Sequence, residues 1–277
     1  MTLAAIAFAR AVYFLAAMAL FGGAALGTLL KSRLPIIAPV RLPRAWIVPA
    51  ALLAACVWFV LAAAQMAGAL SARALLETAT ATLYGQLFLI RIALLLALAL
   101  VPRRRQKLTA LLAAAALALP AATSHAAASS PAGFTAIGTS LDAVHLLTAG
   151  FWIGGLAVLA ALFRRKEPNI LLALSLFSDW ALVSVLLLAM TGLINAASIV
   201  LADKNAAAPL YLGVLGAKLA LVALMLVLAG INRFKRVPRG DQRGIARNAA
   251  WELGLGIIVV LLAGALGQLS PTLVPAG

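Results

Sequence analysis

The feature that most constrains this chain is a recurring run of about 20 apolar residues. A helix of that length crosses a hydrocarbon core of about 30 Å, because each residue adds about 1.5 Å along the axis. Of all residues 65% are hydrophobic, whereas soluble domains contain about 45–50% apolar residues. Alternating segments of about ten residues, typical of membrane β-barrels, are not found. We therefore predict an all-α, polytopic membrane protein with eight transmembrane helices, at roughly 4–29, 47–70, 83–101, 108–123, 137–163, 179–200, 209–231 and 249–270.

The basic residues are concentrated in every second loop. Of the 22 Lys and Arg residues, 17 lie in the loops 31–46, 102–107, 164–166 and 232–248. The alternate loops hold only Arg73 and Lys204. By the positive-inside rule, the four basic loops face the cytoplasm, and both termini lie on the outer side of the membrane. Because the charges lie in short loops between apolar runs, the net charge of +15 does not indicate nucleic-acid binding.

The two halves of the sequence align with each other. "RAVYFLAAMALFGGAAL" matches "DAVHLLTAGFWIGGLAV", which places Tyr13 opposite His145. "LYGQLFLIRIALLLALAL" matches "LYLGVLGAKLALVALMLV", which pairs Arg91 with Lys218. Chance similarity between leucine- and alanine-rich helices is the alternative explanation. With four spans in each half, the alignment predicts a parallel repeat about an axis along the membrane normal. Its parts are the first repeat 1–123, a periplasmic connecting loop 124–136 and the second repeat 137–277.

The two histidines of the chain both fall near the outer face of the membrane. His145 lies about one turn into the fifth span, and His125 follows the fourth. Asp142 is one turn before His145 on the same helix face, where it can ligate metal or fix the imidazole tautomer. Two histidines cannot complete a tetrahedral zinc site, but with a thioether such as Met66 they suit a copper ion. The alternative for His125 is a solvated loop residue.

Several charged residues fall inside the predicted spans. Arg91 and Lys218 lie near mid-membrane, where a cation costs about 3 kcal/mol to insert. Arg10 lies nearer the outer end of its span, and we expect Asp142 to approach it. Glu252 lies near the cytoplasmic end of the last span, and we expect it to approach Lys218. These charges act either as interhelical clamps or as a gate, because fixed positive charge opposes a copper cation in a low dielectric. The candidates for lining the path are Trp152, Asn195 and Tyr13.

Five stretches, in order along the chain, resemble the CopD/PcoD copper-resistance membrane family. "SHAAA" is similar to its G-H-A motif, with Ser124 in place of the glycine, and "HLLTAGFWIGGLAVL" to its H-L-L-A-x-x-x-W-x-G-G-L pattern. "FSDWALVSVLLLAMTGLINA" resembles its F-S-x-x-A…T-G-x-x-x-A helix. "LYLGVLGAKLALVALMLVLAGINRFKRVP" resembles its Y-G-x-x-L-x-x-K…N-R-x-x-x-x-P segment, and "RNAAWELGLGIIVVLLAGALGQLSP" its closing R-x-x-x-x-E helix.

The resemblance implies copper transport across the inner membrane, with import as the favoured direction. It also implies delivery of copper by a periplasmic CopC-like protein. Tyr13 stands where the first helix of such proteins often carries a histidine, and the sequence contains no CopC-like β-domain or Met/His-rich tail. Delivery is therefore expected from a separate partner. The residues to which the resemblance points are His125, His145, Trp152 and Glu252.

Two other functions remain open at this stage. The first is electron transfer through haem b held by both histidines, although the loop position of His125 disfavours it. The second is an assembly factor that binds copper and passes it laterally to a cuproenzyme. An enzyme is not expected, because the chain has no HExxH, no P-loop and no phosphorylatable Asp motif. Homo-oligomerisation is left open.

Overall fold

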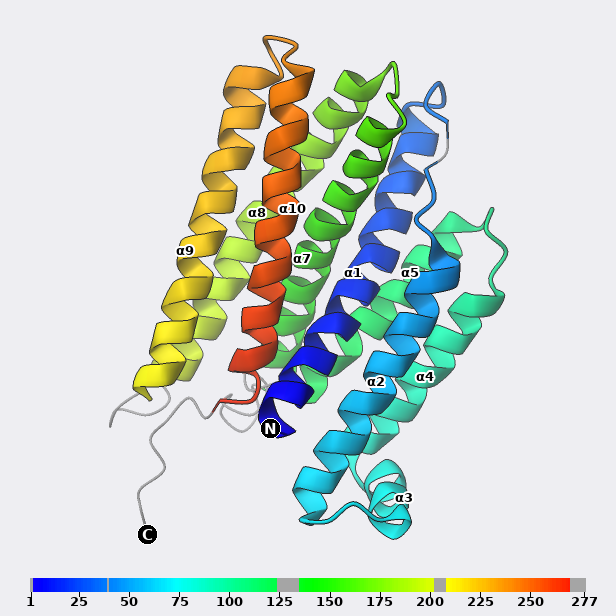
Figure 1. Cartoon of the computed structure of the whole chain (residues 1–277), viewed down its shortest axis with the longest axis vertical. Coiled ribbons are helices and arrows are strands. Elements are labelled where there is room, and N and C mark those ends of the chain that lie inside the picture. Colours follow the sequence, from blue (N-terminus) through cyan, green and yellow to red (C-terminus); the bar gives the residue numbers. More distant parts are fainter. Residues whose placement is uncertain (1, 39, 124–134, 202–207, 270–277) are drawn as a thin grey trace.

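A computed structural model of the chain describes residues 2–38, 40–123, 135–201 and 208–269. His125 lies outside these described residues. In the described residues the regular structure is helical throughout (Figure 1). The elements are α1 (Thr2–Arg33), α2 (Arg44–Ala67), α3 (Ala72–Ala81), α4 (Leu83–Leu100), α5 (Gln106–Ala118), η1 (Leu119–Thr123), α7 (Thr135–Arg164), α8 (Ile170–Leu201), α9 (Pro209–Ile231), η2 (Asn232–Arg236) and α10 (Gln242–Leu266).

The predicted all-α membrane fold is confirmed. Eight helical segments of the described chain are long and apolar enough to cross a membrane. Prolines mark their boundaries: Pro43 precedes α2, Pro102 follows α4 and Pro209 opens α9, a position where its missing N–H costs nothing. The chain is therefore a multi-pass membrane protein.

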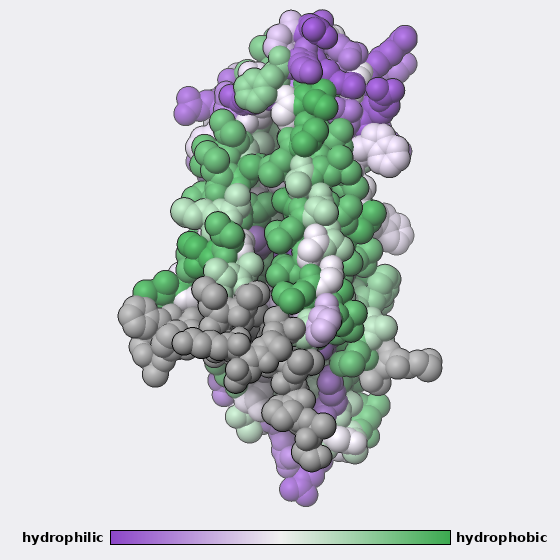
Figure 2. Space-filling view, turned by 90° about the vertical axis from the view of Figure 1, so that its left-hand side faces the viewer, coloured by the Kyte–Doolittle hydropathy of each residue, from purple (hydrophilic) through white to green (hydrophobic). Residues whose placement is uncertain are grey.

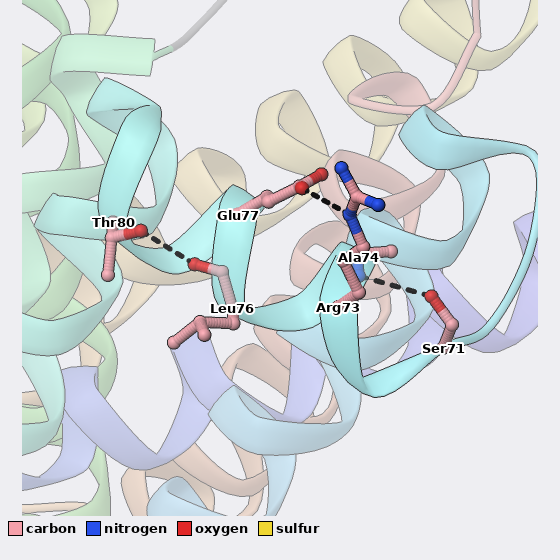
Figure 3. Close-up of polar contacts among 6 residues, drawn as sticks. All are labelled: Ser71, Arg73, Ala74, Leu76, Glu77 and Thr80. Carbon is pink, nitrogen blue, oxygen red and sulfur yellow. Dashed lines mark hydrogen bonds and ion pairs between the residues drawn. The ribbon is translucent and has the colours of Figure 1, made fainter.

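Two local differences from the prediction have packing causes. The sixth span begins at Ile170, nine residues before the expected 179, because Ile170, Leu174 and Phe177 are buried against α7. Residues 71–82, expected to form a loop, contain the ten-residue helix α3. The Ser71 side chain caps α3 by accepting a hydrogen bond from the Ala74 amide, as Figure 3 shows. An exposed Arg73–Glu77 ion pair of 2.7 Å lies on its surface.

The basic loops gather at one end of the helix bundle. Figure 1 shows the α1–α2, α7–α8 and α9–α10 connections at the top and the α4–α5 connection lower on the right, whereas the start of α1 and the end of α10 lie toward the bottom. Figure 2 shows hydrophilic residues at that upper end above a broad apolar band. This arrangement is what the alternation of basic and non-basic loops predicts for a chain inserted with its basic loops on one side.

Helices α1 and α7 form the central pair of the bundle, and glycines allow their close approach. A Cβ atom built on Gly22 would overlap the carbonyl oxygen of Gly150, and one built on Gly154 would overlap that of Met18. In the alignment of the two halves, Gly22 matches Gly154 and Met18 matches Gly150. A reciprocal contact of this kind is expected across a twofold axis, so it favours the four-plus-four repeat, which remains a prediction.

We predict that Gly22→Ala destabilises the protein by about 1–3 kcal/mol, because the added methyl group forces the α1 and α7 backbones apart. The measurement is thermal unfolding of the detergent-solubilised protein. Gly216→Ala on α9 is the matched control, because a Cβ there meets no atom within 4 Å. Equal stability of the two variants would contradict the close contact.

Candidate functional site

The side chain of His145 lies between α7 and α8, in the half of the membrane away from the basic loops. Its Nδ1 is 3.1 Å from Oγ1 of Thr191, which is fully buried on α8. The next residue, Gly192, leaves room for the imidazole, because a Cβ there would be 3.1 Å from Cε1 of His145. Neighbouring residues on α8 thus supply both a hydrogen-bonding group and the space for the ring.

The hydrogen bonds of the Thr191 hydroxyl favour one tautomer of His145. Its proton is donated within α8, to the carbonyl oxygen of Leu187 at 2.7 Å. The Thr191 oxygen is then available to accept a hydrogen bond from Nδ1–H of His145, whose ring also bonds to the backbone of Leu188. In that tautomer Nε2 carries a free lone pair, which is the form in which an imidazole binds a metal ion.

Asp142 lies one turn before His145 and faces the same group of helices. Nδ2 of Asn195 on α8 donates to Oδ1 of Asp142 at 3.4 Å. The Asp142 carboxylate also attracts Arg10 of α1 and Lys218 of α9 electrostatically. Lys218 in turn lies close enough to His145 to interact with it. Four spanning helices therefore contribute to one polar network in the half of the bundle away from the basic loops.

The described residues provide an incomplete set of metal ligands. Within them, no three His, Cys, Asp or Glu side chains are close enough together to hold a metal ion. Of the predicted ligands that the structure describes, His145 and Asp142 share one face of α7. Met66, 57% exposed at the end of α2, lines a different cavity of about 160 Å³, together with Arg10, Trp58 and Tyr84.

The first half of the bundle holds its intramembrane cations against aromatic rings. Arg91 of α4 is 1% exposed, with its guanidinium 5.0 Å from the ring centroid of Tyr13 and 4.7 Å from that of Trp58. The Arg10 guanidinium is 5.4 Å from the Trp58 ring, so that one indole serves both cations. No carboxylate among the described residues forms an ion pair with Arg91. Cation–π attraction therefore replaces a counter-ion.

Tyr13 has a structural position in the core. It is completely buried, and its hydroxyl donates to the carbonyl oxygen of Ala116 on α5 at 2.5 Å. Tyr13 aligns with His145 in the two halves of the sequence. The hydroxyl of Tyr13 and the imidazole of His145 each bind a neighbouring helix, but only the imidazole keeps an atom free for a ligand.

Glu252 lies in a separate cluster near the basic end of the bundle. Its Oε1 accepts a hydrogen bond of 2.9 Å from Nδ2 of Asn232, and the indole of Trp152 also donates to its carboxylate. Asn232 follows Lys218 by 14 residues, about 21 Å along the helix axis. The expected approach of Glu252 to Lys218 is therefore wrong, and Trp152 faces Glu252 rather than His145.

Sequence reasoning missed Thr191, Gly192, Trp58 and Tyr84 as neighbours of the candidate site. The sequence did contain a signal for Thr191. Thr191 and Asn195 are four residues apart and therefore share one face of α8, just as Asp142 and His145, three residues apart, share one face of α7. The partners of Trp58 had no such signal, since Arg10 comes from α1 and both Arg91 and Tyr84 come from α4.

These features define a class: a multi-pass α-helical membrane protein with a partly buried, polar, histidine-containing network between its spans. Residues 1–136 match the family model described as "Copper resistance protein D-like, N-terminal domain", and residues 171–266 match the model "Copper resistance protein D". His145 and Asp142 lie between the two matched segments.

Two curated proteins are similar to this chain. "Copper resistance protein D" of Pseudomonas syringae pv. tomato is 32% identical over 222 residues, which cover 69% of this chain and 70% of that protein. "Copper transport protein CutJ" of Bacillus subtilis (strain 168) is 31% identical over 145 residues, which cover 50% of this chain and 27% of CutJ. No solved structure matches. The chain belongs to the copper resistance protein D family.

We predict that Trp58→Leu lowers stability by about 3 kcal/mol, because it removes a buried ring that two guanidinium groups share. Thermal unfolding in detergent is the measurement. Trp251→Leu is the control, since Trp251 is 63% exposed on α10. A Trp58 variant as stable as the Trp251 variant would remove the proposed stabilisation of Arg10 and Arg91.

Proposed function

We propose that this protein transports copper across the bacterial inner membrane, from the periplasm to the cytoplasm, and that His145 is the first intramembrane ligand. The observation that carries the proposal is the hydrogen bond from His145 to Thr191, which leaves Nε2 free to bind the ion. Membership of the copper resistance protein D family supports copper as the substrate. Transport rather than catalysis is the proposed activity.

The proposed orientation places the His145 network near the periplasm. The four basic loops face the cytoplasm in this proposal, and both termini face the periplasm. His125, which follows the fourth span on the same side, would add a second imidazole, and Asp142 an anionic oxygen. Met66 lines the neighbouring outer cavity, where its thioether suits Cu(I) at the entrance. A separate periplasmic CopC-like protein would deliver the ion.

Lys218 and Arg91 set the electrostatic conditions for passage. Lys218 lies beside His145 and is attracted by Asp142, so a copper ion entering this network meets both signs of charge. A fixed cation repels a bare copper ion strongly in a low dielectric. We propose that Asp142 offsets this repulsion at the binding step, and that movement past Lys218 and Arg91 is the gated step, with Asn195 lining the path.

A lateral assembly factor is the second candidate. The observation that favours it is the same positive charge of Lys218 beside His145, which opposes inward movement of the ion. An assembly factor would bind copper at His145 and release it on the periplasmic side. Copper uptake into vesicles separates the two functions, because only a transporter accumulates the ion. A Soret band in the same preparation would indicate haem b instead.

We predict that His145→Ala abolishes copper binding by the purified protein, and that Thr191→Val weakens it by about 10–100-fold, because the imidazole loses its orienting partner. Thr191→Ser should retain the affinity of the wild type. Ser184→Ala is the control, since it removes another buried hydroxyl of α8 that bonds only within that helix. Bound Cu(I), measured by competition with a chelating dye, is the readout. Unchanged binding in His145→Ala would refute the proposed site.

We predict that a cysteine at position 73 is labelled by a membrane-impermeant maleimide in intact spheroplasts, whereas a cysteine at position 104 is labelled only after lysis. The reason is the proposed periplasmic location of α3 and cytoplasmic location of the loop 102–107. The starting protein carries Cys56→Ser, which removes the single native cysteine. The reverse labelling pattern would show that the protein has the opposite topology, and the proposed direction of transport would then be reversed.

A further inference from the structure

The basic end of the first half of the protein has no acidic residues to neutralise it. Within residues 1–136 the sole acidic residue is Glu77, which is paired with Arg73 on α3 at the opposite end of the bundle. The second half differs, because Arg233 pairs with Asp179 at 3.1 Å, and Arg236 with Asp241 at 3.7 Å. The unneutralised charges of the first half are Lys31, Arg33, Arg41, Arg44, Arg103, Arg104, Arg105 and Lys107.

A cavity of about 360 Å³ opens among these charges. It lies between the middle of α1 and the beginnings of α2 and α5. Its basic lining consists of Arg41, Arg44 and Arg103. The lining contains no carboxylate among the described residues. Its volume is in the range of ligand sites, about 300–1,000 Å³.

The basic side chains of this cavity are partly positioned in advance. Nη1 of Arg44 donates to Oγ1 of Thr109 at 3.3 Å, and Nη2 donates to the carbonyl oxygen of Val101. Arg103 lies close enough to Arg44 to repel it. Both α2 and α5 begin at the cavity without an acidic residue in the first turn, so the positive ends of two helix dipoles add to the same potential. An anion placed here would relieve the repulsion between the guanidinium groups.

Apart from Gln106 and Thr109, the remaining lining of the cavity is apolar, and it reaches the outside of the bundle at Trp46. Leu20, Val40 and Leu42 form part of the lining, and Trp46 lines it while remaining 79% exposed. Leu53 and Val57, seven and eleven residues after Trp46 on the same face of α2, are 67% and 40% exposed. A cationic cavity that adjoins an exposed apolar surface fits a ligand with an anionic head and hydrocarbon chains. Basic pockets between transmembrane helices bind phospholipid head groups in this way.

We propose that this cavity binds a phosphate group, supplied by the head group of an anionic phospholipid whose acyl chains lie along α2 and α5. Arg41 and Arg103 contact the phosphate oxygens, and Arg44 contributes its charge from a fixed position. Guanidinium groups suit this role because their paired N–H donors match phosphate oxygens. The site is distinct from the His145 network and does not depend on copper transport.

The test is native mass spectrometry of the detergent-purified, full-length protein with added phosphatidylglycerol, phosphatidylcholine or inorganic phosphate. The wild type should bind phosphatidylglycerol more tightly than phosphatidylcholine. Arg103→Gln and Arg41→Gln should each lower the affinity for phosphatidylglycerol about fivefold. The matched control is Arg104→Gln, which removes the same charge from the same loop but lies outside the cavity lining.

The outcomes distinguish specific binding in the cavity from non-specific attraction of anionic lipid to a basic surface. An affinity that falls with Arg103→Gln but not with Arg104→Gln supports the site. If inorganic phosphate displaces the lipid, or if its binding also depends on Arg103, the cavity is a phosphate site that binds the free anion as well as the lipid head group. Equal losses in Arg103→Gln and Arg104→Gln, or equal affinity for the two lipids, would overturn the proposal. Unchanged thermal unfolding of the variants confirms that they fold.

Discussion

The close contact between α1 and α7 is the constraint on which the rest of the structure depends. Gly22 on α1 and Gly154 on α7 allow the two backbones to touch where any side chain would separate them. Arg10 and Asp142 are the same number of residues before these glycines, so the contact places them at the same height in the bundle. The attraction between Arg10 and Asp142, and through it the link between the two halves, follows from that register.

The two halves stabilise their intramembrane cations by different means. In the first half, Arg91 has no carboxylate partner among the described residues and lies between the rings of Tyr13 and Trp58. In the second half, the aligned Lys218 interacts with Asp142 and with His145. Aromatic rings stabilise a cation without binding a metal, whereas a carboxylate and an imidazole offer ligands. The difference explains why the proposed copper site belongs to the second half, although both halves carry an intramembrane cation.

The two halves of the protein also differ in the distribution of their acidic residues. The second half neutralises part of its basic end internally, through pairs such as Arg233 with Asp179. The first half holds its only acid, Glu77, at the far end of the bundle. None of the ion pairs among the described residues neutralises its basic end, and the lipid site proposed above rests on this difference. The orientation of the protein in the membrane and its proposed binding of lipid would then depend on the same arginine residues.

The sequence by itself determined the number of spans, their helical structure and the gathering of the basic loops at one end of the bundle. These properties depend on hydropathy and charge summed over about 20 neighbouring residues, so they are local. It also placed Asp142 and His145 on one face, because that depends only on helical spacing. The family resemblance was readable from short motifs for the same reason.

Only the tertiary structure decided which side chains meet. The rotation of α8 against α7 brought Thr191 to His145 and so set the tautomer. The position of η2 brought Asn232 to Glu252 and separated Glu252 from Lys218, and the end of α2 placed Met66 in another cavity. A leucine- and alanine-rich helix shows little periodic difference between its faces, so its sequence does not fix its rotation. Packing of the whole bundle sets that rotation, and with it the partners of every buried polar group.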